Sequence, residues 1–223
     1  MFRALALCLL APALGAQVVT EGVEITGPGR VGVEAAAVLT DGPGWSVNGP
    51  EGLVRVGVGW GAEVRVGLPD YRRAALELGE TGFSDMSAGL GVGLPAPRGW
   101  LASAFATVTL PTTGGPASPL VVVAAERASE RVTVAVQAEA AWDREADRLE
   151  TGGAALASLA LAGPVRGFVE IAGATTPDGW AAVLGHGYVA SVTPTLDVDL
   201  RLGAGLTATA PRAFVGVGAA AVF

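Results

Sequence analysis

A strict alternation of apolar residues with polar or small ones constrains this chain more than any other feature. The stretch 196–206 places leucine, valine or alanine at every even position, and Asp197, Asp199, Arg201 or glycine at the odd ones. The stretches 85–94 and 131–142 repeat the pattern. A period of two separates the two kinds of residue onto opposite faces of a β-strand, whereas a helix would scatter them around its axis. The pattern therefore predicts an all-β protein.

Composition narrows the choice among all-β folds. The chain is 51% hydrophobic and only 16% charged, with a mean hydropathy of +0.49, whereas a soluble domain carries about 25% charged residues. Apart from the N-terminus, no apolar run approaches the roughly 20 residues that a membrane helix needs. Because only helices and closed barrels satisfy their backbone in lipid, we predict a closed antiparallel transmembrane β-barrel with an up-and-down meander. A soluble secreted β-sandwich is the alternative.

Twelve segments carry the alternating pattern, an even number as bacterial barrels require. Ten strands would also fit if two weak segments merge. Longer polar connections are expected at 41–51, 70–82, 111–118 and 143–153, and short turns between the other strands, as in outer-membrane barrels. The predicted strands are 30–40, 52–60, 62–69, 83–94, 100–110, 119–127, 130–142, 153–163, 166–174, 179–191, 195–206 and 212–223.

The first sixteen residues have the organisation of a secretory signal. Arg3 is followed by an apolar run from Ala4 to Ala11 and by small residues at Gly15 and Ala16. We predict a signal peptide at 1–16 and one barrel domain at 17–223. The only cysteine lies inside the signal, so the mature chain has no thiol. The formal net charge is −7 and no residue is lysine, which argues against nucleic acid as a partner.

Two internal motifs and the C-terminus resemble a known family. The segments GETGFSDMSAGLGVGL (79–94) and LASAFATVTLPTTGG (101–115) contain a Gly82-Phe83-Ser84-Asp85 turn and a Leu110-Pro111-Thr112-Thr113-Gly114 strand end, and Phe214–Phe223 closes the chain. In this order they are similar to the outer-membrane family labelled "MetA-pathway of phenol degradation", often described simply as transporters. Ser84 stands where the family has glycine, and Thr113 is inserted before Gly114.

The resemblance implies a β-barrel in the outer membrane of a Gram-negative bacterium that passes small organic molecules, aromatic ones among them. In outer-membrane proteins generally, a terminal aromatic residue resembles the signal read by the barrel-assembly machinery. By parity Phe223 falls on the apolar, lipid-facing side of the last strand. That strand is expected to pair with the first and so close the barrel.

The polar side of each strand is predicted to face the interior, because an arginine facing hydrocarbon would cost roughly 2–4 kcal/mol at the bilayer midplane. Eight acids and four arginines have this parity, together with two phenylalanines suited to contact an apolar solute, and the only histidine is added because a lone histidine on a strand is more often a lumen or rim residue. The predicted lumen residues are Glu34, Arg55, Glu63, Arg65, Asp85, Phe105, Glu126, Arg131, Glu139, Phe168, Glu170, His186, Asp197, Asp199 and Arg201.

These residues support two functional interpretations. The lumen is either a channel with a mixed-charge lining that leans acidic, or an interior filled by arginine–carboxylate pairs that fix strand register. Twelve strands leave a narrow or partly plugged lumen. We predict a passive channel for small molecules with outer-membrane lipid around it. The alternative is a non-conducting barrel that is structural or adhesive, and a barrel lipid hydrolase is a weaker one.

Catalysis and metal binding have little support in the sequence. A hydrolase would need a serine beside His186, and Ser158 or Ser191 could serve, but neither lies in a nucleophile motif. One histidine and no mature cysteine cannot form a zinc site. Asp197 and Asp199 could hold Ca²⁺ weakly. We therefore predict no enzyme activity and no cofactor.

The five tryptophans are predicted near strand ends, where aromatic girdles anchor barrels at the membrane surface. They are Trp45, Trp60, Trp100, Trp142 and Trp180.

Overall fold

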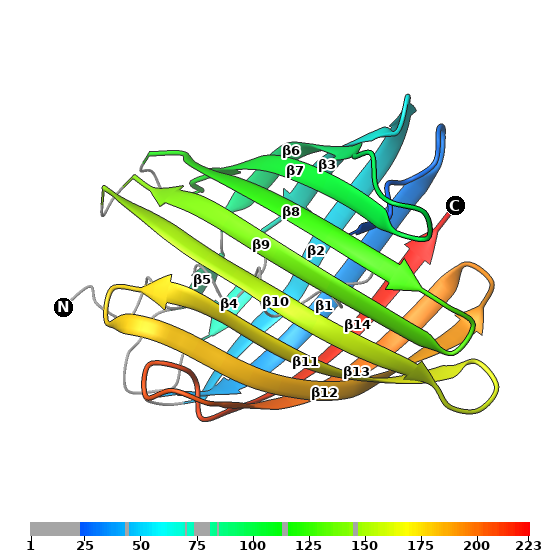
Figure 1. The fold of residues 1–223 in the computed structure, drawn as a ribbon. Coiled ribbons are helices and arrows are strands. Elements are labelled where there is room, and N and C mark those ends of the chain that lie inside the picture. The colour runs from blue at the N-terminus through cyan, green and yellow to red at the C-terminus, as the bar shows by residue number, and fades with distance from the viewer. Residues whose placement is uncertain are drawn as a thin grey trace.

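The computed structural model describes residues 23–42, 45–69, 71–73, 81–83, 85–112, 116–144 and 147–223, so the predicted signal peptide lies outside the described residues. One antiparallel sheet closes into a barrel, seen from the side in Figure 1. Twelve strands form the ring: β1 (Val31–Asp41), β2 (Trp45–Gly59), β3 (Ala62–Leu68), β6 (Met86–Gly93), β7 (Leu101–Leu110), β8 (Ser118–Ala128), β9 (Val132–Asp143), β10 (Arg148–Ala160), β11 (Val165–Thr176), β12 (Gly179–Thr193), β13 (Leu196–Gly205) and β14 (Ala213–Val222). Each corresponds to a predicted segment.

Pairing of the first strand with the last closes the ring. β1 pairs with β2 on one side and with β14 on the other, in a register that runs from Gly32↔Val222 to Asp41↔Ala213. Beyond this ladder, Val31 N donates to Phe223 O at 3.1 Å and Phe223 N donates to Val31 O at 2.9 Å. Closure removes the exposed edges that an open sheet would present. The predicted meander and its closure are confirmed.

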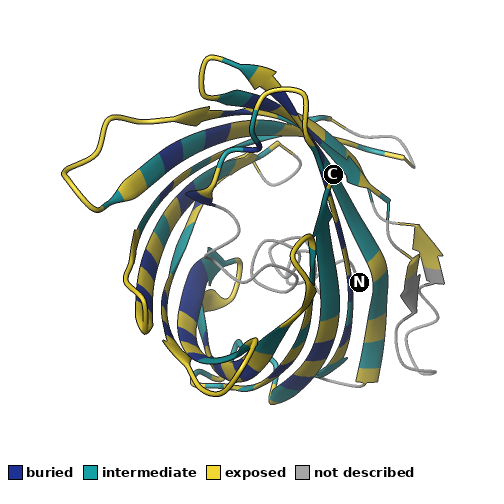
Figure 2. Ribbon diagram, turned by 90° about the vertical axis from the view of Figure 1, so that its right-hand side faces the viewer, coloured by how far each residue is buried: buried dark blue, intermediate teal, exposed yellow. Residues whose placement is uncertain are grey.

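Burial alternates along the strands as stripes, which Figure 2 shows. In β13, Arg201 is 1% exposed while Leu200 and Leu202 beside it are 43% and 36% exposed. Because successive side chains of a strand point to opposite faces, Arg201 lies on the inner face and the two leucines on the outer one. Asp197 and Asp199 share this parity and are half-buried.

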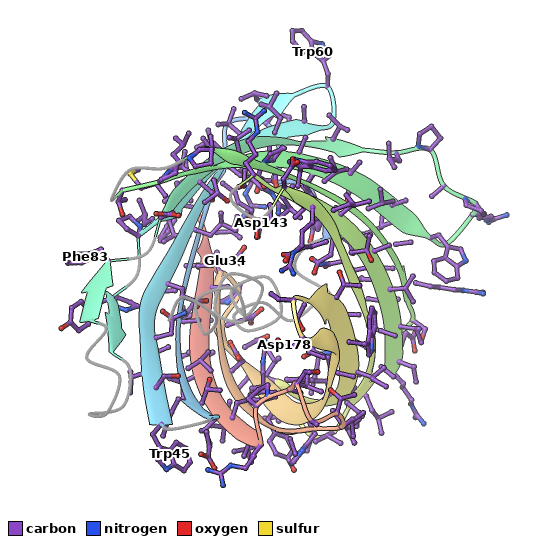
Figure 3. All side chains as sticks on the ribbon, turned by 90° about the vertical axis from the view of Figure 1, so that its left-hand side faces the viewer. Glu34, Trp45, Trp60, Phe83, Asp143 and Asp178 are labelled. Carbon is purple, nitrogen blue, oxygen red and sulfur yellow. The ribbon has the colours of Figure 1, made fainter. Side chains whose placement is uncertain are left out.

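A small hairpin lies outside the ring, in the connection between β3 and β6. It consists of β4 (Tyr71–Arg73) and β5 (Thr81–Phe83). β4 extends the sheet by pairing with Val47 and Asn48 of β2. The rings of Tyr71 and Phe83 meet edge to face, with centroids 5.7 Å apart. Phe83, labelled in Figure 3, projects away from the barrel.

Two predicted loops are wrong, because strands occupy most of them. β2 begins at Trp45, within the predicted loop 41–51, and β10 begins at Arg148, within 143–153. Pro50 lies in β2 where the register with β1 shifts, between the pairs Ala36↔Glu51 and Val38↔Asn48, and such an irregularity accommodates proline in a sheet. The ends of β9 and β10 are polar yet keep their ladder through Arg148↔Asp143. Polar strand ends can therefore extend the barrel beyond an apolar band.

The barrel has two distinguishable ends. Val31 and Phe223 mark the terminal end, where the turns 60–61, 129–131, 161–164 and 194–195 also lie. The long connection 69–85 lies at the opposite end. The connections 144–147 and 177–178 at that opposite end are also short, so the predicted contrast in loop length holds only in part.

Candidate functional site

The barrel wall separates two surfaces of opposite character. Outward side chains are apolar and exposed, as Val169 at 54% and Val217 at 53% illustrate, whereas the inward Glu63 and Glu170 are almost fully buried. A water-soluble protein has the reverse arrangement, with charged groups outside. The outer face therefore suits hydrocarbon, and the inner face is the candidate functional site.

One polar cluster lies across β6 and is called here the β6 wall: Glu63 and Arg65 on β3, Gly91 on β6 and Phe105 on β7. Arg65 Nε forms a buried hydrogen-bonded ion pair with Glu63. The Arg65 guanidinium also lies over the Phe105 ring, 3.5 Å from its centroid, within the range of a cation–π contact. A Cβ at position 91 would lie 2.7 Å from the Phe105 ring. Glycine at 91 thus allows side chains from β3 and β7 to meet over β6.

The segment before β1, residues 23–30, packs against this wall. Thr26 N donates to Glu63 Oε2 at 2.6 Å, and Val23, 2% exposed, packs with Phe105 and Ala124 on the inner face. The segment also accepts a hydrogen bond at Glu24 O from Arg55 Nη1, at 3.1 Å. These contacts place 23–30 inside the barrel near the terminal end.

Arg55 also connects β2 to β1. Its Nε lies 2.7 Å from Glu34 Oε1, and both side chains are about nine-tenths buried. In Figure 3, Glu34 lies within the ring. Because Arg55 is directly opposite Arg65 in the β2–β3 register, the two guanidiniums are neighbours. The pairs with Glu34 and Glu63 offset their repulsion.

A second cluster lies across β12 and is called the β12 wall: Phe168 and Glu170 on β11, Gly187 on β12 and Arg201 on β13. Arg201 Nη1 is 3.9 Å from Glu170 Oε1, and its guanidinium lies 6.0 Å from the Phe168 ring centroid. A Cβ at position 187 would lie 2.6 Å from that ring. Phe168 packs with Leu156 of the neighbouring β10 and with Ala135 of β9.

Further acids lie on β9 and β10 toward the opposite end. Glu139 is buried, and its Oε2 accepts a hydrogen bond from Gln137 Nε2 at 3.3 Å. Glu139 Oε1 has no hydrogen-bond partner among the residues that the structure describes. Glu150 is paired with Arg148. This part of the inner face thus carries one compensated and one uncompensated carboxylate.

Sequence reasoning missed several inward charged residues, among them Arg166 of β11 and the ion pair of Arg148 and Glu150 on β10. Arg166 of β11 has the parity of Phe168 and Glu170, both of which were predicted to face inward, so the same alternation identifies it. Its Nη2 donates to Thr133 Oγ1 and to Ser158 Oγ. Arg166 belongs with the inner-face residues near the terminal end.

Twelve of the fifteen predicted lumen residues lie on the inner face of a strand. Two others lie just outside strands. Arg131 is exposed in the turn before β9. Asp85 precedes β6 and accepts a hydrogen bond from Thr112 N at 2.9 Å. His186 is the exception. The inner-face set is Glu34, Arg55, Glu63, Arg65, Phe105, Glu126, Glu139, Phe168, Glu170, Asp197, Asp199 and Arg201.

The prediction that His186 lines the lumen is wrong. His186 is exposed and pairs with Val169 and Leu202, which are outward residues. The inward positions on either side of it are glycines. Residue type suggested the lumen, but parity decides the face. Ser158 is on the inner face and Ser191 has the inward parity of β12, so neither forms a catalytic pair with this imidazole.

The tryptophans lie at both ends of the barrel. Trp45, Trp142 and Trp180 are exposed at strand ends on the opposite end of the barrel. Trp60 lies at the terminal end, in the turn between β2 and β3. In Figure 3, Trp60 projects from the barrel. The placement is that of the aromatic girdles of membrane barrels.

None of the described ranges contains a helix that is long and apolar enough to cross a membrane. Nor do the described residues contain a group of three or more histidine, cysteine, aspartate or glutamate residues that could hold a metal ion.

Known structures share this architecture, although no protein-family model matches the sequence and no curated protein matches it. The COG4313 outer-membrane channel from Pseudomonas putida F1 superposes with a TM-score of 0.67 at 12% identity, over 90% of this chain and 98% of that one. The KdgM porin in complex with disordered oligogalacturonate gives 0.64 at 7% identity, over 86% and 99%. The NanC porin gives 0.60 at 7% identity, over 86% and 98%. With its apolar outer face, the chain thus has the fold of an outer-membrane β-barrel.

Proposed function

We propose that this protein is an outer-membrane channel that passes small molecules by passive diffusion through a narrow lumen. The observation that carries the proposal is the division of the wall into an apolar outer face and a charged inner face in a closed barrel. Each charge buried in a dry interior costs free energy unless it is paired. A charged inner face of this extent therefore favours a water-filled lumen. The similarity in fold to outer-membrane channels and porins supports the same function.

The size of the ring limits the cargo to small solutes. Barrels of eight strands are filled by side chains, whereas those of 16–18 leave an open aqueous channel, so twelve strands leave a narrow passage. Phe105 and Phe168 would contact the apolar part of an organic solute. Aromatic cargo rests on the resemblance to the MetA-pathway family and on these two rings.

The location follows from the same features. We propose that residues 1–16 direct secretion and are removed, and that the mature barrel inserts into the outer membrane of a Gram-negative bacterium. Phe223 is outward and 73% exposed at the end of the closing strand. There it would be available to the barrel-assembly machinery as a C-terminal signal. The terminal end would then face the periplasm, as it does in barrels of this kind.

Single-channel recording tests the channel. Purified protein in a planar lipid bilayer is expected to give stepwise currents, and Asp199→Asn is expected to change their ion selectivity because Asp199 is half-buried on the inner face. Leu200→Ala, on the outer side of the same strand, is the matched control and should leave selectivity unchanged. Silence of the wild-type protein would refute conduction.

A non-conducting barrel is the second candidate, and one observation favours it. Residues 23–30 and the ion pairs of both walls occupy inner space. In that case the connection 69–85, with its β4–β5 hairpin, would present a binding surface outside the cell. The two candidates differ in the recording above, and cell adhesion lost on removal of 71–83 would support the second.

A further inference from the structure

We propose that Arg166, Thr133 and Ser158 form a binding station for a small organic carboxylate inside the barrel, near the terminal end. The proposal deepens the channel function and rests on it for its physiological role. The three residues come from β11, β9 and β10, which are neighbours in the sheet. The carboxylate station is defined by these three side chains.

The first step is the orientation of the guanidinium. Arg166 Nη2 donates to Thr133 Oγ1 and to Ser158 Oγ, the latter at 3.1 Å. Thr133 is 2% exposed and Ser158 7% exposed, so both acceptors are fixed parts of the wall. Arg166 itself is half-buried. One edge of the guanidinium is therefore held by the wall and its charge remains within reach of the lumen.

Arg166 differs from the other inward arginines in its charged neighbours. Arg55, Arg65 and Arg201, the other buried inward arginines, each have a carboxylate within ion-pair distance. Arg166 has none among the described residues, and Glu126 on β8 acts on it only at longer range. Neutral hydroxyls orient a cation without cancelling its charge. The station thus keeps a net positive charge that an anion can neutralise.

The third step identifies the ligand class. A guanidinium presents five N–H donors in a planar fork, and each can form a charge-assisted hydrogen bond with a carboxylate oxygen. Only Nη2 is engaged by the wall, so the N–H groups of Nε and of Nη1, which lie on different sides of the guanidinium, can each donate to a carboxylate oxygen. Toward the middle of the same strands lie Ala135, Leu156 and Phe168, which form one apolar cluster. A carboxylate with an apolar or aromatic body could contact both Arg166 and this apolar cluster. Benzoate is the simplest probe of this kind.

The first experiment measures binding without requiring conduction. Radiolabelled benzoate is equilibrated by dialysis with the folded barrel in detergent. Arg166→Gln is expected to weaken binding about tenfold or more, the scale of a lost charge-assisted hydrogen bond. Arg127→Gln is the matched control. Arg127 lies on β8 near the same end of the barrel, is exposed and has outward parity. Equal binding by wild type and Arg166→Gln, or an equal loss in Arg127→Gln, would overturn the station.

Two further variants separate charge from orientation. Arg166→Lys keeps the charge without the fork, and the double variant Thr133→Val with Ser158→Ala keeps the guanidinium without its acceptors. Both are expected to bind benzoate several-fold more weakly than wild type. If Arg166→Gln fails to fold, these two variants decide, and unchanged binding in both would reject the proposal.

Single-channel recording then separates the station from the channel. Benzoate is expected to interrupt the current briefly in wild type and much less in Arg166→Gln. Dialysis binding that depends on Arg166, together with a silent bilayer, would keep the station and refute the channel. Currents with benzoate binding that is independent of Arg166 would do the reverse.

Discussion

The β6 wall and the β12 wall contain the same types of residue and lie on opposite sides of the barrel. Each has a phenylalanine, a glutamate and an arginine that meet over a glycine of the middle strand. β6 and β12 are six strands apart in either direction round the ring, through β7–β11 or through β3, β2, β1, β14 and β13. The two clusters therefore face each other across the lumen.

The two walls differ in packing, and among the described residues only the β6 wall is contacted by a segment from outside the strands. At the β6 wall, Thr26 and Val23 of the segment 23–30 contact Glu63 and Phe105, and the Arg65–Phe105 distance is 3.5 Å. At the β12 wall, the Arg201–Phe168 distance is 6.0 Å and the ion pair is 3.9 Å long. The wall that residues 23–30 cover is thus the more tightly packed of the two.

The largest expected effect is the loss of the β6 carboxylate. Glu63→Gln leaves Arg65 buried beside a neutral amide and should lower the free energy of unfolding by about 3–5 kcal/mol. Glu170→Gln should cost less, because the Arg201 pair is longer. Urea unfolding of both variants in detergent measures the difference. Equal losses would mean that the segment 23–30 adds nothing to the β6 wall.

The two glycines give the next contrast. A Cβ at 187 would lie 2.2 Å from Leu200 O, a backbone atom, whereas a Cβ at 91 would meet only the side chains of Phe105 and Glu63 within 3.0 Å. Gly187→Ala is therefore expected to cost about 3 kcal/mol, and Gly91→Ala nearer 1 kcal/mol, because side chains yield more readily than a sheet backbone. The same unfolding assay ranks them, and the reverse order would contradict the geometry.

Removal of one hydrogen bond loosens the β6 wall alone. Thr26→Pro removes the N–H that donates a hydrogen bond to Glu63. This should lower the free energy of unfolding by about 2 kcal/mol, the value of a hydrogen bond to a charged group. Thr26→Val keeps the N–H and, like the proline variant, lacks the Thr26 hydroxyl that also bonds to Glu63, so the difference between the two variants isolates the N–H. Single-channel conductance should rise in the proline variant, because residues 23–30 would leave the lumen more often. Identical conductance in both variants would place the constriction elsewhere.

The smallest effect is expected on the outer side of the β12 wall. His186→Leu replaces a polar side chain on the lipid-facing surface with an apolar one and should stabilise the barrel by about 1 kcal/mol in lipid. His186→Asn keeps a polar group there and serves as the control. Refolding titrations in lipid vesicles measure the gain. A loss of stability would mean that the imidazole has a polar partner in the membrane.

Parity was enough to locate most of the inner face. The alternation in 196–206 placed Asp199 and Arg201 inward, and the same rule would have found Arg166 and corrected His186 had it been applied regardless of residue type. The extent of β2 could not be read in this way. Pro50 interrupts the pattern, and only pairing with β1 through a bulge retains this stretch as strand.

The sequence by itself determined the strand number, the face of nearly every residue and the closure of the barrel, because side-chain direction alternates with the local backbone geometry of a strand. Only the tertiary structure decided the partners. Arg65 and Phe105, or Arg166 and Thr133, are far apart in sequence, and their contacts depend on the stagger between strands and on a glycine or a hydroxyl beside them. The position of residues 23–30 inside the barrel likewise depends on contacts with Arg55 and Glu63, which lie more than thirty residues away in the sequence.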